Sequence, residues 1–120
     1  MRSALSKTTI IGRIGQAPET KKLESGQSVT KFSVATNSFM NGKDGSKQIT
    51  DWHNVTLWGN EALVPHLKKG QLVYVQGRNK YGTYERNIGN EKVEWPTVEI
   101  VASEVEILHT PEAVKEAQSA

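Results

Sequence analysis

Short stretches of alternating apolar and polar residues recur along the chain, separated by polar segments rich in glycine, proline and asparagine. Successive side chains of a β-strand point to opposite faces, so a period of two predicts strands rather than helices. The expected strands are residues 7–15, 28–37, 49–59, 71–77 and 98–108. The fourth is expected to continue through residues 78–86 to a hairpin tip at residues 87–90.

The third of these strands has the least usual pattern. Trp52 and Trp58 share one face with small polar residues, and His53, Val55 and Leu57 share the other. The face with the aliphatic residues suits a core, whereas two indoles on the opposite face can form a platform for flat ligands. The alternative is that both tryptophans are half-buried sheet residues, since tryptophan favours strands.

Two connecting segments carry distinct signals. Residues 61–69 predict one short helix that begins after Asn60 and ends before Gly70. Pro65 lies beyond its first turn and should kink it, because proline lacks a backbone donor. Residues 40–48 contain Asn-Gly and Asp-Gly turn signals and predict a flexible, mostly basic loop.

Five strands, one short helix between the third and fourth, and glycines inside the first strand predict an all-β domain closed into a small barrel. This arrangement is typical of the OB-fold, a five-stranded Greek-key barrel that binds oligonucleotides or oligosaccharides on its strand 2–3 face. We expect this domain to span residues 7–109. Residues 1–6 and 110–120 are expected to be flexible termini.

Composition narrows the chemistry. The chain has 120 residues and no cysteine, so it fits one domain without disulfides or thiolate metal sites. No apolar run is long enough to span a membrane, and we expect a soluble protein without membrane contact. Net charge is only +2, but it runs from +5 over residues 1–47 and +2 over residues 48–92 to −5 over residues 93–120. A basic body suits a polyanion, and the alternative is a solvated surface of mixed charge.

An enzymatic role is not indicated. The three histidines, His53, His66 and His109, lie far apart in unlike contexts. No nucleophile-elbow, zinc-protease or phosphate-loop pattern occurs, and the glycines at residues 12 and 15 lack the spacing of a dinucleotide-binding turn. We therefore expect no catalytic site, no metal and no cofactor.

Four segments carry a family resemblance, in order and at near-family spacing between about residues 7 and 108. They are residues 12–19, with a Gly-x-hydrophobic-Gly-x-x-Pro-Glu pattern, residues 32–37, the Asp-Trp-His and Trp-Gly elements of residues 51–59, and residues 67–77. Together they resemble the bacterial and mitochondrial single-stranded DNA-binding proteins. The resemblance implies a homotetramer of OB-folds around which single strands wrap, with bases stacked on aromatic side chains.

The resemblance also suggests roles for individual residues. By position, Trp52, Trp58 and Tyr84 match the family's stacking aromatics. Another family aromatic aligns with Met40, and the neighbouring Phe39 is expected to substitute for it. The remaining expected DNA contacts are Tyr81 and Trp95, which lie on the hairpin that family members drape over DNA. His53 matches a histidine at the family's subunit interface, and Tyr74 matches a structural tyrosine.

Basic side chains are the candidates for phosphate contacts, because Lys and Arg release condensed counterions and make binding depend on salt. The alternative for each is a solvated surface charge. The candidates are Arg13, Lys31, Lys43, Lys47, Arg78, Lys80 and Arg86.

Three departures from the family pattern concern a turn, the helix and the chain end. Ala17 replaces the usual Asp, and the helix segment is shorter and contains Pro65. Residues 115–120 lack the acidic-hydrophobic tip through which bacterial members recruit partners. This tail and Gly12-Arg13 point to a mitochondrial member, located in the matrix and nucleoid. The alternatives are the bacterial cytoplasm, a phage protein or a truncated bacterial chain.

The expected function is protection of single-stranded DNA during replication, repair and maintenance of an organellar genome. Replication proteins are candidate partners. Two other functions stay open, namely an OB-fold module that binds an oligosaccharide and one that binds a protein partner.

Overall fold

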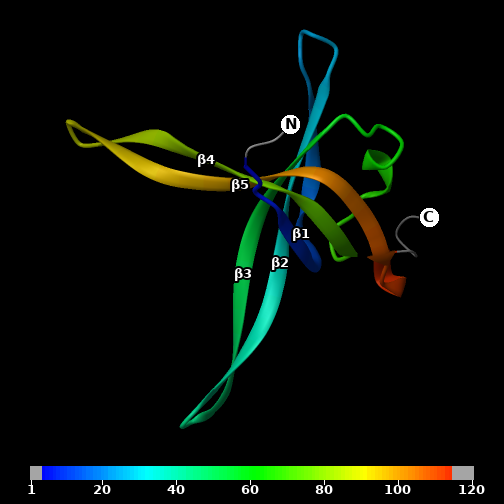
Figure 1. Cartoon of the computed structure of the whole chain (residues 1–120), viewed down its shortest axis with the longest axis vertical. Helices are drawn as coiled ribbons and strands as arrows, with labels where there is room; N and C mark the ends of the chain where they lie inside the picture. Colours follow the sequence, from blue (N-terminus) through cyan, green and yellow to red (C-terminus); the bar gives the residue numbers. More distant parts are fainter. Residues whose placement is uncertain (1–3, 115–120) are drawn as a thin grey trace.

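The strands close into a barrel, as the alternating pattern predicts (Figure 1). The computed structural model describes residues 4–114. Its strands are β1 (Thr8–Lys22), β2 (Ser28–Gly42), β3 (Gly45–Trp58), β4 (Leu72–Ile88) and β5 (Glu91–His109). They follow each other around the barrel in the order β1-β2-β3-β5-β4, and β4 pairs with β1 to close it. All pairs are antiparallel except the short parallel pair of β3 and β5. The predicted OB-fold is confirmed.

The barrel interior is filled by the apolar face of each strand. The predicted core face of the third strand is confirmed for Val55 and Leu57, and Phe32 and Val34 of β2 are buried with them, all four 5% exposed or less. Burial of such side chains is the main favourable contribution to folding. The other buried apolar residues in this cluster are Ile14, Leu67, Val73, Val75, Ile100 and Val105.

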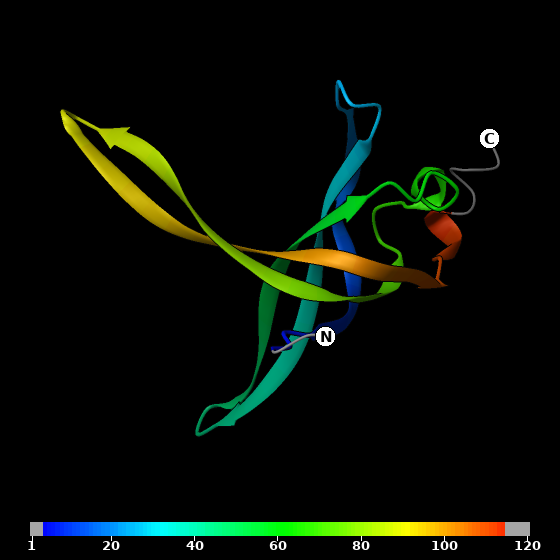
Figure 2. The ribbon, with the colours of Figure 1, turned by 45° about the horizontal axis from the view of Figure 1, so that its top comes forward.

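Three hairpins extend beyond the barrel in different directions, because the strands are longer than the barrel needs (Figures 1 and 2). The β2–β3 arm shows that the loop predicted for residues 40–48 was wrong. Pairing continues to Gly42 and Gly45, which leaves only Lys43 and Asp44 as the turn. Gly45 has φ 108°, a conformation that favours glycine and allows so tight a turn.

The predicted continuation of the fourth strand to a hairpin tip at residues 87–90 is confirmed, whereas the fifth strand is longer than predicted. Strand β5 begins at Glu91, and its pairing with β4 runs without a break from Arg86 and Val93 to Lys80 and Glu99. Pro96 is tolerated within this arm, where β5 has a neighbour on one side only.

The short helix predicted between the third and fourth strands is present, but it is much shorter than residues 61–69. This segment contains only one 3₁₀ turn, η1 (Val64–His66), and Asn60 has φ 54° rather than an N-cap conformation. Pro65 lies in the turn and limits its length.

The buried Gln71 holds the segment in place of a longer helix. Its Oε1 accepts a hydrogen bond from the Lys68 backbone N–H at 2.7 Å, and its Nε2 donates to the His66 carbonyl at 3.0 Å. The same Nε2 donates to Thr110 Oγ1 at 3.2 Å, which ties the residues after β5 to this turn.

The expected flexible termini, residues 1–6 and 110–120, lie partly outside the described residues. Within them, residues 112–114 are helical, and the Val114 backbone N–H donates to the Pro111 carbonyl at 3.0 Å. In residues 4–114, no helix has the length and apolar character needed to cross a membrane.

Candidate nucleic-acid interface

The outer face of β2 and β3 is a ladder of directly opposed residue pairs. Opposed residues of antiparallel strands point to the same face, so each pair forms one rung. The four successive rungs are Ala35–Trp52, Ser33–Asn54, Lys31–Thr56 and Val29–Trp58. Strand β1 extends the second of these rungs with Gln16 and the third with Glu19.

Both tryptophans of this face lie outside the barrel, Trp52 61% exposed and Trp58 47% exposed. They are about 20 Å apart along β3, at a rise of roughly 3.3 Å per residue. The indole of Trp52 lies directly over Gly15, where a β-carbon would collide with the ring. The absence of a side chain at Gly15 therefore lets the Trp52 ring approach β1 this closely.

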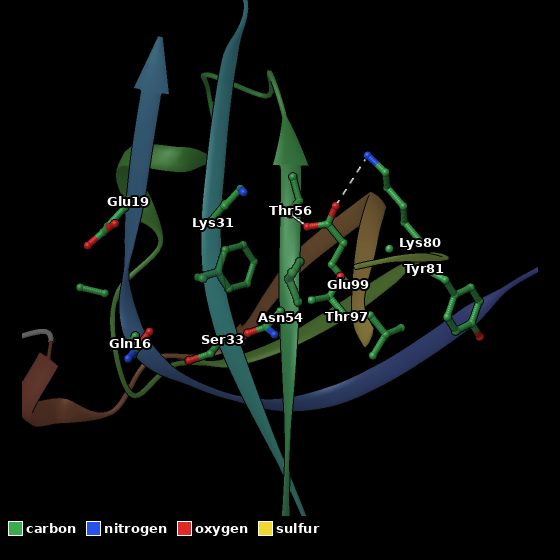
Figure 3. Close-up of a pocket in the computed structure, with 15 residues that line it drawn as sticks. Gln16, Glu19, Lys31, Ser33, Asn54, Thr56, Lys80, Tyr81, Thr97 and Glu99 are labelled. Atoms are coloured by element: carbon green, nitrogen blue, oxygen red, sulfur yellow. Dashed lines mark hydrogen bonds and ion pairs between the residues drawn. The ribbon is translucent and has the colours of Figure 1, made fainter. Parts of the chain in front are cut away.

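A groove lies between the two tryptophan rungs and the base of the β4–β5 arm (Figure 3). It encloses about 480 Å³, and Trp58 lines an adjoining hollow of about 520 Å³. The two hollows form one concave surface, here called the groove, because they share the residues Glu19, Lys31, Thr56, Lys80 and Glu99.

Cations and two carboxylates, Glu19 and Glu99, meet in this groove. Lys31 is exposed on its floor and forms no ion pair within the described part of the chain. Glu99 accepts a hydrogen bond from Thr56 Oγ1 at 2.8 Å and lies 4.0 Å from Lys80 Nζ. Glu99 therefore offsets the charge of Lys80, whereas Lys31 is directly opposed by Glu19 of β1 without forming an ion pair with it.

The β4–β5 arm carries an aromatic pair. Tyr84 and Trp95 are directly opposed, and they are 50% and 43% exposed. By alternation, Arg78, Lys80 and Arg86 share the face of Tyr84. The arm thus presents two rings together with three cations.

Tyr81 lies on the other face of this arm. It is 73% exposed, lines the groove at the base of the arm, and its hydroxyl accepts a hydrogen bond from Asn79 Nδ2 at 3.3 Å. Tyr81 therefore points to the opposite side of the arm from Tyr84 and Trp95.

The β2–β3 arm separates Phe39 from Met40. Phe39 pairs with Gln48 and, by alternation, shares the face of Trp52, whereas Met40 pairs with Lys47 on the opposite face. Phe39 is also 72% exposed. The register therefore favours Phe39 as the aromatic that continues the tryptophan face. Lys43 lies in the turn at the arm's tip.

The side chains of Arg13 and His53 form hydrogen bonds with other residues of this chain. Arg13 Nη1 donates to the Gly70 carbonyl at 3.0 Å and so links β1 to the segment after η1. His53 is half-buried, and its Nε2 lies 2.9 Å from Thr36 Oγ1. It points away from the tryptophan face, and its assignment to a subunit interface stays a prediction.

Sequence reasoning did not name several polar residues of the groove as binding residues, among them Gln16, Ser33, Asn54 and Glu99. Alternation places Asn54 on the face of the tryptophans and Ser33 on the outer face of the second strand, but it does not show that they line a groove. The positions of Gln16 and Glu99 depend on the register between strands, including a bulge in β1 after Ile14, which the alternation does not specify.

Comparison with known proteins decides the family. The model of the single-strand binding protein family matches residues 5–108. The chain belongs to this family. It is 37% identical over 108 residues to the single-stranded DNA-binding protein of Neisseria meningitidis serogroup A, covering 88% of this chain and 60% of that protein. The corresponding protein of Xanthomonas axonopodis pv. citri is 35% identical over 111 residues, covering 90% of this chain and 60% of that protein.

Solved structures of the single-strand binding family agree with the fold. The Plasmodium falciparum SSB complex with ssDNA aligns with a TM-score of 0.77 and 30% identity, covering 91% of this chain and 99% of that one. A deletion mutant of the Thermus aquaticus single-stranded DNA binding protein aligns with a TM-score of 0.71 and 25% identity, covering 88% of this chain and 51% of that one.

The chain thus spans about 60% of the length of the two curated relatives. Both relatives are bacterial, so they give no support to the expected mitochondrial likeness.

Proposed function

We propose that this chain binds single-stranded DNA without strong sequence preference. The observation that carries the proposal is the pair of exposed indoles, Trp52 and Trp58, on one strand face with the unpaired Lys31 between them. Every base has a π face, so stacking on an aromatic ring contributes about 1–3 kcal/mol per base and tolerates any sequence. Family membership and the Plasmodium falciparum complex with ssDNA support the same function.

The groove and two arms supply the proposed contacts. DNA bases stack on Trp52 and Trp58 in and beside the groove, on Phe39 along the β2–β3 arm, and on the β4–β5 arm. The stacking residues of that last arm are Tyr81, Tyr84 and Trp95. Lys31 provides the central phosphate contact. The other proposed phosphate contacts are Lys43 and Lys47 on the β2–β3 arm, Arg78, Lys80 and Arg86 on the β4–β5 arm, and Arg13, which lies outside the groove and both arms.

The chain's role follows from this binding. It protects single strands during DNA replication, repair and maintenance, and no step of it requires catalysis. The bacterial relatives favour the bacterial cytoplasm over the mitochondrial matrix as its location. Replication proteins remain the proposed partners.

We also propose that the chain assembles as a homotetramer. Ile11 is 55% exposed and pairs with the half-buried Tyr74 across β1 and β4, on the outside of the barrel. An exposed aliphatic side chain beside a tyrosine suits a contact with a second copy.

Salt dependence tests the proposed function. Anisotropy of labelled oligo-dT, measured between about 50 and 200 mM salt, should show a steep loss of affinity, with a slope of about −0.7 per neutralised phosphate. Lys31→Ala should make the slope shallower by about 0.7, whereas Lys69→Ala, an exposed lysine outside the groove, should leave it unchanged. Absence of binding by the folded chain would refute the function. Oligo-dT affinity that does not change with salt would contradict the phosphate contacts, and salt-independent binding of an oligosaccharide in place of oligo-dT would favour the carbohydrate alternative.

A further inference from the structure

The floor of the groove beside Trp52 is polar. Gln16 of β1, Ser33 of β2 and Asn54 of β3 form one rung across three strands, and all three line the groove (Figure 3). The neighbouring rungs contain Trp52 on one side and Lys31 on the other. A flat ligand stacked on Trp52 therefore has this rung beside it.

The hydrogen-bonding groups of this rung are unused. The amides of Gln16 and Asn54 are exposed and make no side-chain hydrogen bond within residues 4–114. Ser33 is only 9% exposed, and its hydroxyl oxygen is buried without a partner. A buried hydroxyl without a partner lowers stability, and most such groups in folded proteins are paired.

The chemistry of the rung matches a nucleobase edge. Each amide carries one acceptor and two donors in a plane, and the edge of every base offers donors and acceptors in a plane. A base edge that fixes the two amides over Ser33 also gives its hydroxyl the partner that it lacks. Lys31, one rung further, is placed for the adjoining phosphate.

We propose that Gln16, Ser33 and Asn54 form a subsite that hydrogen-bonds the edge of a nucleobase held beside Trp52. The inference rests on the proposed function and adds to it. Stacking on indoles recognises the faces of bases, whereas this subsite recognises their edges. Part of the affinity for single-stranded DNA therefore depends on the hydrogen-bonding groups of the bases.

A non-hydrogen-bonding isostere tests the subsite. The probes are an oligo-dT of about eight nucleotides, within the site size of one OB-fold, and the same oligonucleotide with its thymines replaced by difluorotoluene, which keeps the shape of the base. The measured quantity is the ratio of the two dissociation constants. Because stacking differences between the probes are common to all variants, changes in this ratio between variants report on edge contacts.

The expected result is that Gln16→Ala/Asn54→Ala reduces the preference for thymine about 3- to 10-fold, the range of one net hydrogen bond or slightly more. Gln27→Ala, an exposed amide in the β1–β2 turn, should keep the wild-type ratio. An unchanged ratio in the double variant would overturn the subsite while leaving the proposed function intact. Failure of the wild-type chain to bind oligo-dT would overturn both.

Ser33→Ala provides an independent readout. Removal of a buried hydroxyl without a partner should raise or preserve the thermal midpoint, and the same change should reduce the preference for thymine over the isostere. A role in folding alone would not alter that preference. A preference equal to that of the wild type would remove Ser33 from the subsite.

Discussion

Trp52 and Trp58 share a strand face, but the residues beside their indole rings differ. Trp52 lies over Gly15, whereas Trp58 pairs with the buried Val29 at the far end of the groove. The position of the Trp52 indole thus depends on the absence of a side chain at Gly15 in β1, two strands away from β3. Alternation predicts the shared face, but it cannot predict what lies beneath each ring.

Gly15→Ala should displace the Trp52 ring and weaken oligo-dT binding by up to about 1–3 kcal/mol, the contribution of one base stack. The loss should vanish in a Trp52→Ala background, because the two changes then act through the same ring. Binding measurements on the two single variants and the double variant provide the test. Additive losses would contradict this coupling between Gly15 and Trp52.

At the scale of elements, the segment between β3 and β4 shows where sequence reasoning failed. The residues at its two ends, Asn60 and Gly70, favour a helix over residues 61–69, but this segment contains only η1. Pro65 limits the helical turn, and the side chain of Gln71 satisfies backbone groups that a longer helix would have paired. A buried glutamine that bonds distant residues leaves no periodic signal.

Gln71→Ala should lower the free energy of unfolding by about 1–3 kcal/mol, because it leaves buried polar groups unpaired. Urea denaturation measures the change, and the exposed Gln27→Ala serves as its control. A free energy of unfolding within about 0.5 kcal/mol of the wild-type value, typical of surface changes, would show that Gln71 does not hold this segment.

The β4–β5 arm begins beside a carboxylate, Glu99, whose charge is expected to oppose the proposed binding of DNA. Glu99 lies 4.0 Å from Lys80 Nζ, and the two side chains are 29% and 59% exposed. An ion pair this exposed contributes little to the stability of the fold. Its main expected effect is therefore on the charge that this surface presents to phosphates.

Glu99→Gln should therefore strengthen oligo-dT binding and steepen its salt dependence by about 0.7, since Lys80 becomes available to one more phosphate. The amide oxygen can still accept the hydrogen bond from Thr56, so the fold should not change. Glu104→Gln, an exposed residue of β5 outside the groove, is the matched control. Equal salt slopes for the two variants would rule out this role for Glu99.

At the scale of the whole molecule, the sequence predicted the barrel and the tip of the β4–β5 hairpin, but not the length of the β2–β3 arm or the early start of β5. Closure follows from five alternating strands whose apolar faces, such as Val73 and Val75, must be buried together. The arms contain paired strands without a core, and their exposed residues resemble those of loops. Turn signals such as Asp44-Gly45 mark the position of a tip but not how far the pairing reaches.

The proposed assembly also belongs to this scale. Light scattering at micromolar concentration should give about four times the 13.3 kDa mass of one chain. Ile11→Glu should reduce that mass, because it places a charge on the exposed apolar side of β1. A mass near that of one chain for the unmodified protein would refute the tetramer.

The most direct test of base stacking follows the emission of one indole. The chain has three tryptophans, so the double variant Trp52→Phe/Trp95→Phe leaves Trp58 as the only tryptophan that fluoresces. Saturation of this variant with oligo-dT should quench its fluorescence in step with the anisotropy of the labelled DNA. Binding by anisotropy with unchanged Trp58 emission would contradict the account, because DNA would then attach without stacking at the end of the groove.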